Sequence, residues 1–404
     1  MNTRQIQCFG CSLLCDDLYI EFDTNGILHT IVNSCFRGTR FIKNYLSDQR
    51  IRQSIQKQMG LDMLLSTEEA ISILEQELLK AQSIKFYGIG AISYQDQLAV
   101  MQKIVELKKK NKTVYVDGIK EIFDFFILFQ TTIGQAINNA DLFLFWECDP
   151  THSHPKLFGK LLFSRGMFRL SGKEMKKLII VQKQDSDLTR LKDILIDRSS
   201  QTTSQIIKNF INLLENKSLD TITIGNLSRD NLRELKAFLE ATEYGVLVCN
   251  TPLGDYFQPD ELNRYLARLN ASGKGRFVFL PLTPTSNYFG MYAAYTKIVG
   301  NYSESVTPLK DGYADLAIIF GGEYLRDEFS RHPLEIPEKK VILFDNLKSN
   351  YSNHARITIP YAIPGIECDG TAIRMDNVNV DLSLWNSPNE NIYTIQKIFN
   401  KISL

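Results

Sequence analysis

Ala140-Asp-Leu-Phe-Leu-Phe145 is a short apolar run led by one aspartate, and a similar run returns as Ala314-Asp-Leu-Ala-Ile-Ile-Phe320. Uninterrupted apolar runs of this length are typical of strands that are buried on both faces of a sheet. Because the two runs begin with the same three residues, they indicate that one α/β scheme occurs twice in the chain.

Further apolar runs flank each of these two. They begin at Lys85, Thr113 and Lys177 around the first run and at Tyr244, Arg276 and Lys340 around the second. Segments with helical periodicity separate the runs, and the helix expected after Ser66 has that serine as its N-cap. Apolar strands joined by helical crossovers predict parallel sheets with a functional crevice at the carboxyl ends of the strands. The sequence therefore predicts the α/β class, with two doubly wound α/β domains.

The beginning of the chain has a different pattern. Residues 17–22 alternate as in a strand, residues 23–26 form a turn and residues 27–32 return as a second strand. We expect four parts, which are a small cysteine-rich β unit of the iron–sulfur type (1–58), a first α/β domain (59–195), a second α/β domain (196–345) and a C-terminal segment that packs back on the others (346–404).

The overall charge argues against polyanionic partners. The 46 basic and 46 acidic residues cancel, so neither nucleic acid nor an acidic membrane is expected to bind. No apolar run reaches eighteen residues, and Met1-Asn-Thr-Arg-Gln lacks the basic and apolar regions of a secretion signal. We therefore expect a cytoplasmic protein.

Four of the seven cysteines, Cys8, Cys11, Cys15 and Cys35, lie near the amino terminus. In a reducing compartment, cysteines crowded in this way are expected to bind a metal, because their thiolates remain available as ligands. The other three cysteines are scattered and are expected to be small buried side chains.

The cysteine spacing favours an iron–sulfur cluster. Three cysteines in one compact loop and one distant cysteine suit a [4Fe–4S] cluster, which takes four thiolates at varied spacings. Structural zinc sites usually pair two similar knuckles, and zinc remains the alternative. Gly10 and Gly38 would let backbone amides approach the sulfurs.

Several segments resemble one known family. The cysteine segments Cys8-Phe-Gly-Cys-Ser-Leu-Leu-Cys-Asp-Asp and Asn33-Ser-Cys-Phe-Arg-Gly look like the cluster segment of molybdopterin- and tungstopterin-dependent oxidoreductases, and most like that of the B-type subunit of formylmethanofuran dehydrogenase. Trp146-Glu-Cys-Asp-Pro-Thr-His-Ser-His-Pro-Lys is similar to the Trp-Gly-x-Asn-Pro-x-His-x-His-Pro-Arg segment of the same family. Ala362-Ile-Pro-Gly-Ile-Glu-Cys-Asp-Gly-Thr-Ala-Ile-Arg-Met-Asp-Asn-Val is close to another of its segments.

The resemblance implies a molybdopterin-oxidoreductase-like fold and a set of cofactor positions. It implies that Cys8, Cys11, Cys15 and Cys35 are the metal ligands. It further implies a molybdopterin or tungstopterin guanine dinucleotide site, whose matching residues in this chain look vestigial: His152, His154, Gly321, Gly322, Gly370, Thr371 and Arg374. Each of these residues also has an ordinary structural interpretation, as a turn, a local hydrogen bond or interdomain packing.

The chain departs from the family where the metal–pterin would react. Residues 115–126, which match the family loop that supplies a metal-ligating cysteine, contain no cysteine; Asp117 or Glu121 is a weaker alternative ligand. Residues 282–290 have no arginine to hold a negatively charged substrate. Glu147 replaces a glycine beside the cofactor, and Gln182-Lys-Gln-Asp-Ser-Asp replaces the Asp-Pro-Arg of the family.

These losses favour a protein that keeps the fold without the metal–pterin chemistry. The B-type component of the formyltransferase/hydrolase complex of methylotrophic bacteria is such a relative, and this chain resembles it in character. The resemblance then implies a non-redox scaffold in one-carbon (formyl to formate) metabolism, with no catalytic residues of its own. Its partners would be hydrolase-type, transferase-type and C-type subunits. The alternatives are an active tungsten or molybdenum formylmethanofuran dehydrogenase subunit with a [4Fe–4S] cluster, and a zinc-stapled assembly protein.

Overall fold

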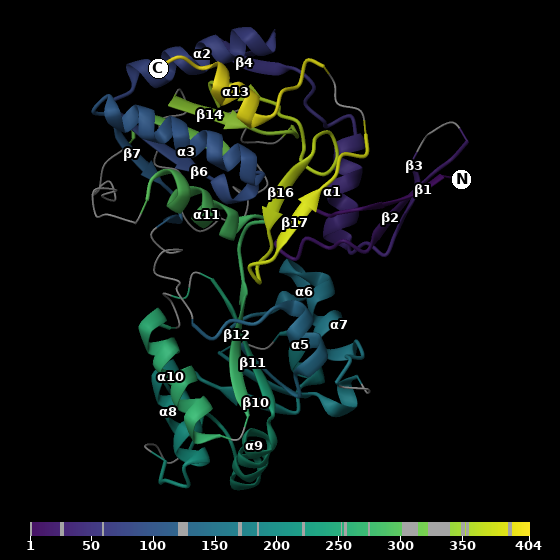
Figure 1. Cartoon of the computed structure of the whole chain (residues 1–404), viewed down its shortest axis with the longest axis vertical. Helices are drawn as coiled ribbons and strands as arrows, with labels where there is room; N and C mark the ends of the chain where they lie inside the picture. The colour runs from purple at the N-terminus through teal and green to yellow at the C-terminus, as the bar shows by residue number, and fades with distance from the viewer. Residues whose placement is uncertain are drawn as a thin grey trace. The chain divides into compact units, whose positions relative to one another are not determined.

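A computed structural model describes residues 2–24, 28–58, 60–119, 128–168, 172–183, 186–219, 223–251, 253, 257–273, 275–300, 314–321, 340–348, 352, 355–386 and 390–404. The chain forms two compact units (Figure 1). Unit 1 consists of Met1–Phe123, Thr285–Arg374 and Asn379–Leu404, and unit 2 consists of Asp124–Pro284 and Met375–Val378.

Unit 2 is built on a five-stranded parallel sheet with the order β10-β9-β8-β11-β12. Its strands are β8 (Leu142–Trp146), β9 (Lys177–Gln182), β10 (Ile194–Asp197), β11 (Tyr244–Asn250) and β12 (Arg276–Leu282). The chain adds strands outward from β8 in one direction and then restarts at β11 in the other. The order therefore reverses between β8 and β11, and this is the switch point at which doubly wound folds place their crevice.

Helices cover the sheet of unit 2. Figure 1 shows α8 and α10 on one side of the strands and α5, α6 and α7 on the other. The helices of this unit are α5 (Ile133–Asn139), α6 (Pro150–Ser153), α7 (Pro155–Phe163), α8 (Thr203–Leu214), α9 (Arg229–Ala241) and α10 (Pro259–Ser272). Every residue of β8 is buried, as expected for a central strand covered on both faces.

Unit 1 contains a seven-stranded sheet with the order β5-β4-β15-β14-β13-β6-β7. Its strands are β4 (Ser54–Gln58), β5 (Leu61–Leu65), β6 (Ser83–Tyr87), β7 (Thr113–Val116), β13 (Leu316–Phe320), β14 (Val341–Phe344) and β15 (Ile357–Ile359). The five strands from β15 to β7 run parallel, and β4 and β5 add an antiparallel hairpin at one edge. The order of the parallel strands reverses between β6 and β13, so unit 1 has a switch point of its own.

The rest of unit 1 consists of helices and two small antiparallel sheets. Helix α3 packs against α11 and α13. The helices are α1 (Phe36–Leu46), α2 (Thr67–Lys80), α3 (Tyr94–Lys109), α11 (Tyr288–Ile298) and α13 (Ile395–Lys401). The small sheets are β1 (Asn2–Ile6), β2 (Leu18–Phe22) and β3 (Leu28–Val32), and β16 (Gly370–Ile373) with β17 (Asn379–Leu382).

The repeated Ala-Asp-Leu segments mark the two switch points. Asp141 precedes β8, and its carboxylate accepts the backbone N–H groups of Glu243 at 2.8 Å and Tyr244 at 3.1 Å, where β11 starts. Asp315 precedes β13 in the same way and accepts the N–H groups of Gln82 and Ser83 at 3.0 Å, where β6 starts. In each unit the aspartate therefore fixes the start of the strand across the switch point, satisfying amides that precede the ladder.

The expected fold class is confirmed, because the chain has two sheets built around parallel strands with helical crossovers and a small β unit at its start. The expected hairpin is present as β2 and β3, and Ser66 caps α2 in a capping box with Glu69. Among the described residues, no helix is long and apolar enough to cross a bilayer.

The expected boundaries at 58, 195 and 345 do not match the two units. Strands β6 and β7 share a sheet with β13 and β14 rather than with β8 and β9, and residues 1–58 and most of 346–404 belong to unit 1. Apolar runs reveal where strands lie but not which strands pair, because the pairing here joins segments more than 200 residues apart.

Candidate metal centre and cofactor site

The connection between β1 and β2 brings three cysteines together. The Cys8 N–H donates to the Cys15 carbonyl at 2.8 Å, which closes the loop, and the Leu14 N–H donates to the Cys11 carbonyl at 3.2 Å. Leu14 has a φ of 41° and is fully buried, so the loop accepts backbone strain to turn its leucine inward. Phe9 and Leu14 pack with Ala372 of β16 and Leu382 of β17, so the C-terminal hairpin covers this loop.

The fourth cysteine begins a helix beside this loop. Cys35 is the N-cap of α1, and its Sγ accepts the Gly38 N–H at 3.4 Å. The Gly10 N–H donates to Cys8 Sγ at the same distance. A Cβ at position 38 would lie 3.1 Å from Cys8 Sγ and 2.7 Å from Ser34 Oγ, so the helix approaches the loop sulfur only because residue 38 is glycine. Both glycines that the sequence singled out therefore contact sulfur.

The four thiols share one electrostatic environment. Burial raises the pKa of the Cys8 thiol, and negative charge on Cys11, Cys15 and Cys35 raises it further. Burial likewise raises the pKa of Cys11, while a hydrogen bond from the Leu13 backbone and the nearby Arg37 guanidinium lower it. Four thiolates gathered here would repel one another, and bound metal cations would remove this penalty because a ligating thiol is deprotonated outright.

This donor set fits an iron–sulfur cluster. It offers four thiols, two amide N–H donors to sulfur and the N-terminus of a helix, which favours negative charge. In the described part of the chain, no three or more His, Cys, Asp or Glu side chains gather closely enough to hold a single metal ion. A cubane spreads its four cysteine sulfurs over four separate irons, so it does not require such a close group.

At the switch point of unit 2, an ion pair fills the position after β8. The Glu147 carboxylate pairs with the Arg198 guanidinium, which follows β10, and the two side chains are 13% and 10% exposed. The Glu147 N–H donates to the Val181 carbonyl at 2.8 Å, and the Asn250 amide contacts the Glu147 carbonyl at 3.4 Å. The residues that end β8, β9, β10 and β11 are thus linked through Glu147.

The backbone of Glu147 has a conformation that suits glycine. Its φ is 45°, in the left-handed region that costs an ordinary residue about 1–2 kcal/mol. The family that the chain resembles has a glycine at this position. The chain therefore keeps a glycine-like turn while carrying a side chain that reaches Arg198.

The switch point of unit 1 is lined by glycines. Gly88 follows β6 with a φ of 71°, and Gly321 follows β13 with a φ of 80°. The Gly321 N–H donates to the Phe344 carbonyl at 2.8 Å, and a Cβ on Gly321 would lie 3.8 Å from Ala91. Gly321 thus has a backbone conformation that favours glycine, while Gly322 lies outside the described residues.

The loop after β7 begins with Asp117, the alternative metal ligand. Its N–H donates to the Phe86 carbonyl at 2.9 Å, and its negative charge, after burial, raises the pKa of Tyr87. Glu121, the other alternative ligand, lies outside the described residues.

The two histidines after β8 occupy different environments. His152 is in α6 and is 79% exposed, with Nε2 3.8 Å from Asp187. His154 is buried, and its Nδ1 lies 3.0 Å from Ser153 Oγ. Because one ring faces solvent and the other is enclosed, the two do not form a common ligand pair.

Two further expected cofactor residues are engaged within unit 1. The Thr371 N–H donates to Gln95 Oε1 at 2.9 Å, and Gln95 Nε2 donates to Thr371 Oγ1 at 3.1 Å. A Cβ on Gly370 would lie 3.2 Å from that of Ser93. These contacts join β16 to the start of α3. Arg374, just beyond β16, also interacts with neighbouring groups.

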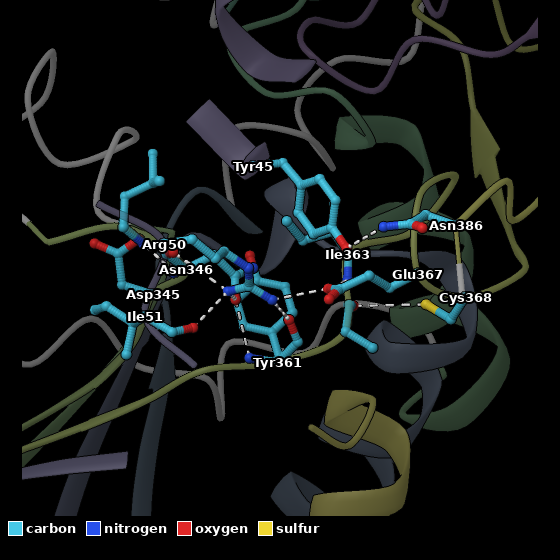
Figure 2. A network of polar contacts seen from close by, with 12 residues as sticks. Tyr45, Arg50, Ile51, Asp345, Asn346, Tyr361, Ile363, Glu367, Cys368 and Asn386 are labelled. Atoms are coloured by element: carbon cyan, nitrogen blue, oxygen red, sulfur yellow. Dashed lines mark hydrogen bonds and ion pairs between the residues drawn. The ribbon is translucent and has the colours of Figure 1, made fainter. Parts of the chain in front are cut away.

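A buried polar network in unit 1 was not predicted from the sequence (Figure 2). Arg50 and Glu367 form an ion pair at 2.8 Å with side chains only 1% and 3% exposed. Arg50 also donates to the carbonyls of Ile51, Asn346 and Tyr361. The Glu367 carboxylate accepts the Ile363 N–H at 3.0 Å.

This network reaches the helix that begins at Cys35. The Arg50 guanidinium carbon lies 5.7 Å from the ring centroid of Tyr45, and the Tyr45 hydroxyl accepts the Asn386 side-chain amide at 2.8 Å. Burial raises the pKa of Tyr45, and the negative charge of Glu367 adds to the effect. Tyr45 is in the last turn of α1, so the network fixes one end of the helix whose other end carries Cys35.

Comparison with known proteins gives one consistent result. No protein-family model matches the chain. The B-type subunit of the tungsten-containing formylmethanofuran dehydrogenase 2 of Methanocaldococcus jannaschii is 23% identical over 424 residues, covering 98% of this chain and 96% of that protein. The chain resembles the B-type subunit of formylmethanofuran dehydrogenase. The corresponding protein of Methanococcus maripaludis is also 23% identical, covering 94% of this chain and 93% of that protein.

A solved structure shares the fold. The crystal structure of the formyltransferase/hydrolase complex from Methylorubrum extorquens with methylofuran contains a chain that matches with a TM-score of 0.59 and 15% identity. The match covers 86% of this chain and 97% of that chain. The expected resemblance to the B-type subunit is thereby confirmed, and the proteins to which this chain is similar are components of multi-subunit assemblies.

The stretch that lacks the arginine of the family pattern has a structural role in this chain. Asn287, in the middle of it, is fully buried; its N–H donates to the Gly90 carbonyl and its side chain binds Ile92 and Ile373. A Cβ on Gly90 would lie 2.3 Å from Thr285 Oγ1, so the two segments are in tight contact. In this chain the segment holds α11, the turn after β6 and β16 together.

Proposed function

We propose that this chain is a B-type scaffold subunit of a formyltransferase/hydrolase complex related to formylmethanofuran dehydrogenase, acting in formyl-to-formate metabolism without redox catalysis of its own. Its partners are hydrolase-type, transferase-type and C-type subunits, in the cytoplasm. The observation that carries this proposal is the Glu147–Arg198 pair, which occupies the unit 2 switch point with a carboxylate of the protein. A carboxylate there opposes the phosphates of a pterin nucleotide.

The residues around the other expected cofactor positions support the same conclusion. Thr371 and Gly370 serve the packing of β16 on α3, and Asn287 locks the stretch that lacks an arginine. His152 and His154 face different environments. The chain thus uses these positions for its own stability.

Metal analysis of the assembled complex tests the proposal. The chain is purified with its partner subunits, molybdenum and tungsten are measured, and reduction of a viologen dye by formate or the formyl carrier is followed. We expect neither metal at stoichiometric level and no dye reduction. Stoichiometric tungsten or molybdenum together with dye reduction would overturn the scaffold role.

We also propose that Cys8, Cys11, Cys15 and Cys35 hold a [4Fe–4S] cluster that staples the start of unit 1. The support is the fit of four interacting thiols, two amide donors and a helix N-terminus. The cluster gives broad visible absorbance, whereas zinc gives none. A colourless protein with one zinc per chain would replace this proposal with the zinc-stapled alternative.

The retained thiols favour a second candidate, an active tungsten or molybdenum enzyme in which the cluster relays electrons. In that case, Cys15→Ser would abolish formate-dependent dye reduction by the complex. In the scaffold role, the same substitution changes only cluster content, stability or assembly.

A further inference from the structure

Unit 2 exposes large apolar side chains at the end of α7 and in the segments that follow it. Phe163, Met167, Phe168 and Met175 are 51%, 75%, 66% and 53% exposed. Phenylalanine and methionine are enriched in protein interfaces, and apolar side chains that gather on a surface mark contact sites. We call these four residues the Phe163 patch.

A buried lysine fixes the backbone under the Phe163 patch. The Lys176 side chain is fully buried, and its ammonium donates to the carbonyls of Leu161 at 2.6 Å, Ser164 at 2.9 Å and Ile137 at 3.4 Å. Leu161 and Ser164 lie at the end of α7, where the last carbonyls lack helical partners. Lys176, which directly follows Met175, therefore caps α7 and joins it to α5.

Other contacts fix the segments that carry the exposed side chains. Asn138 accepts the Met167 N–H through its side chain at 2.8 Å and the Phe168 N–H through its carbonyl at 3.3 Å. Glycines allow these close approaches, because a Cβ on Gly166 would lie 2.4 Å from the Ile137 carbonyl oxygen and one on Gly172 2.9 Å from that of Phe163. The patch is thus presented on a preorganised backbone, which lowers the entropy cost of binding.

Basic residues flank the Phe163 patch on the side of α7. Lys156, Lys160 and Arg165 lie on or just after this helix, which has no acidic residue. Lys173 and Lys177, in contrast, pair with Asp193, and Lys176 is buried. Lys156, Lys160 and Phe163 are spaced to lie on one face of α7, and Gly159 between them has open space above it. Arg165 is exposed at the end of this helix. An apolar centre with a basic rim is complementary to an apolar surface with an acidic rim.

We propose that the Phe163 patch is the docking surface of unit 2 for another protein subunit of the complex, one that presents an apolar surface with an acidic rim. This inference rests on the proposed membership of a multi-subunit complex. The neighbouring charges steer this partner, and the rigid apolar centre holds it.

The test uses the full chain, affinity-tagged and co-expressed with the transferase-, hydrolase- and C-type subunits of its own organism. In Met167→Ser/Phe168→Ser, we expect the amount of one defined partner that co-purifies to fall at least about tenfold, as for the loss of interface anchors. The melting temperature of the isolated chain should stay unchanged, because both side chains are exposed. Leu191→Ser, at another exposed apolar residue of unit 2, should leave the complex intact.

A second variant tests the basic rim. Arg165→Glu should slow association with the same partner, and the difference from wild type should shrink as salt concentration rises. Unchanged partner recovery in Met167→Ser/Phe168→Ser would overturn the docking proposal. It would also be overturned if the substitutions instead abolished binding to phosphatidylserine–phosphatidylcholine vesicles, or abolished a dimer of this chain, with the complex intact.

The experiments distinguish a failure of the docking-surface proposal from a failure of the scaffold proposal. Stoichiometric tungsten with dye reduction would overturn the scaffold role, yet a partner lost from Met167→Ser/Phe168→Ser would still establish the surface. Conversely, a complex without metal that keeps all its subunits in this variant would retain the scaffold role and reject the surface.

Discussion

The cysteine loop of unit 1 and the end of β8 in unit 2 treat negative charge in opposite ways. Around Cys8 the structure gathers three other cysteines, whose negative charge adds to burial in raising the pKa of the Cys8 thiol, with amide donors aimed at two of the sulfurs. At Glu147 the acid faces a cation of the same chain, Arg198. Bound metal cations would relieve the repulsion in the first arrangement, whereas in the second the two charges of the chain offset each other.

Under the proposed function, the fold keeps one cofactor position and closes another. The glycines next to Cys8 and Cys35 preserve close approach to sulfur. Glu147, in contrast, keeps the φ of a glycine but adds a side chain whose ion pair offsets the strain. If this comparison is right, the two regions should respond in distinct ways to substitution.

Loss of a thiol should have the largest effect. We expect Cys15→Ser to lower iron from about four atoms per chain to below one and to remove the visible absorbance, because a cubane needs all four ligands. Cys368→Ser is the matched control, since Cys368 is partly buried outside the loop and bonds the Ala362 carbonyl. Iron retained in Cys15→Ser, or lost in Cys368→Ser, would contradict the assignment.

Breaking the Arg50–Glu367 pair should weaken the unit that carries the thiols. Arg50→Met leaves a buried carboxylate unpaired, which costs about 3–5 kcal/mol of unfolding free energy, measured by urea denaturation. Arg233→Met is the control, because its pair with Asp230 is exposed and should contribute less than about 1 kcal/mol. Equal effects of the two substitutions would show that the buried pair does not fix α1.

The Glu147–Arg198 pair should show a strong coupling without any ligand. Glu147→Gly relieves the backbone strain of the positive φ but removes the carboxylate that pairs with Arg198, so we expect it to destabilise the chain. Arg198→Leu should also destabilise it. In the double variant most of the loss should return, giving a coupling energy of about 2–3 kcal/mol from a double-mutant cycle. Strictly additive losses would mean that the pair does not close the switch point.

A buried carboxyl of unit 1 should give the smallest effect. Burial raises the pKa of Asp96 to about 6, opposed by hydrogen bonds from Ser93 and the Gln396 amide. Because the folded pKa exceeds the unfolded one, its contribution to stability is full at pH below about 4 and is lost as pH rises through 6.

Asp96→Asn keeps the amide-accepting oxygen but cannot ionise. Its unfolding free energy relative to wild type should therefore rise by about 2 kcal/mol between pH 4 and pH 7. A difference that stays constant over this range would show that Asp96 is charged at no cost in the folded protein.

Local features of the sequence predicted much of the fold. Apolar runs located the central strands, and Ser66 was recognised as the N-cap of α2, to which the structure adds a capping box with Glu69. Strand pairing could not be predicted, because β6 pairs with β13, which is more than 200 residues away in the sequence. The two aspartates before β8 and β13 were visible as a repeat, but their role depends on the strand across the switch point.

The same limit applies to the candidate site. Cys8, Cys11 and Cys15 are close in sequence, so their convergence could be expected. Arg50 and Glu367 lie 317 residues apart, and nothing in either local sequence indicates the other. The pairing of Glu147 with Arg198 was missed for the same reason. The positive φ of residue 147 agrees with the glycine that the resembled family has at this position.

Unit 1 is assembled from three separate segments of the chain, and this affects how the protein folds during synthesis. Apart from four residues, unit 2 occupies one continuous stretch, so its sheet can fold while the chain is still being synthesised. The cysteine loop is synthesised long before its apolar cover, Ala372 of β16 and Leu382 of β17. Cluster insertion into a nascent chain would therefore meet an uncovered loop, and the later synthesis of β16 and β17 would seal it.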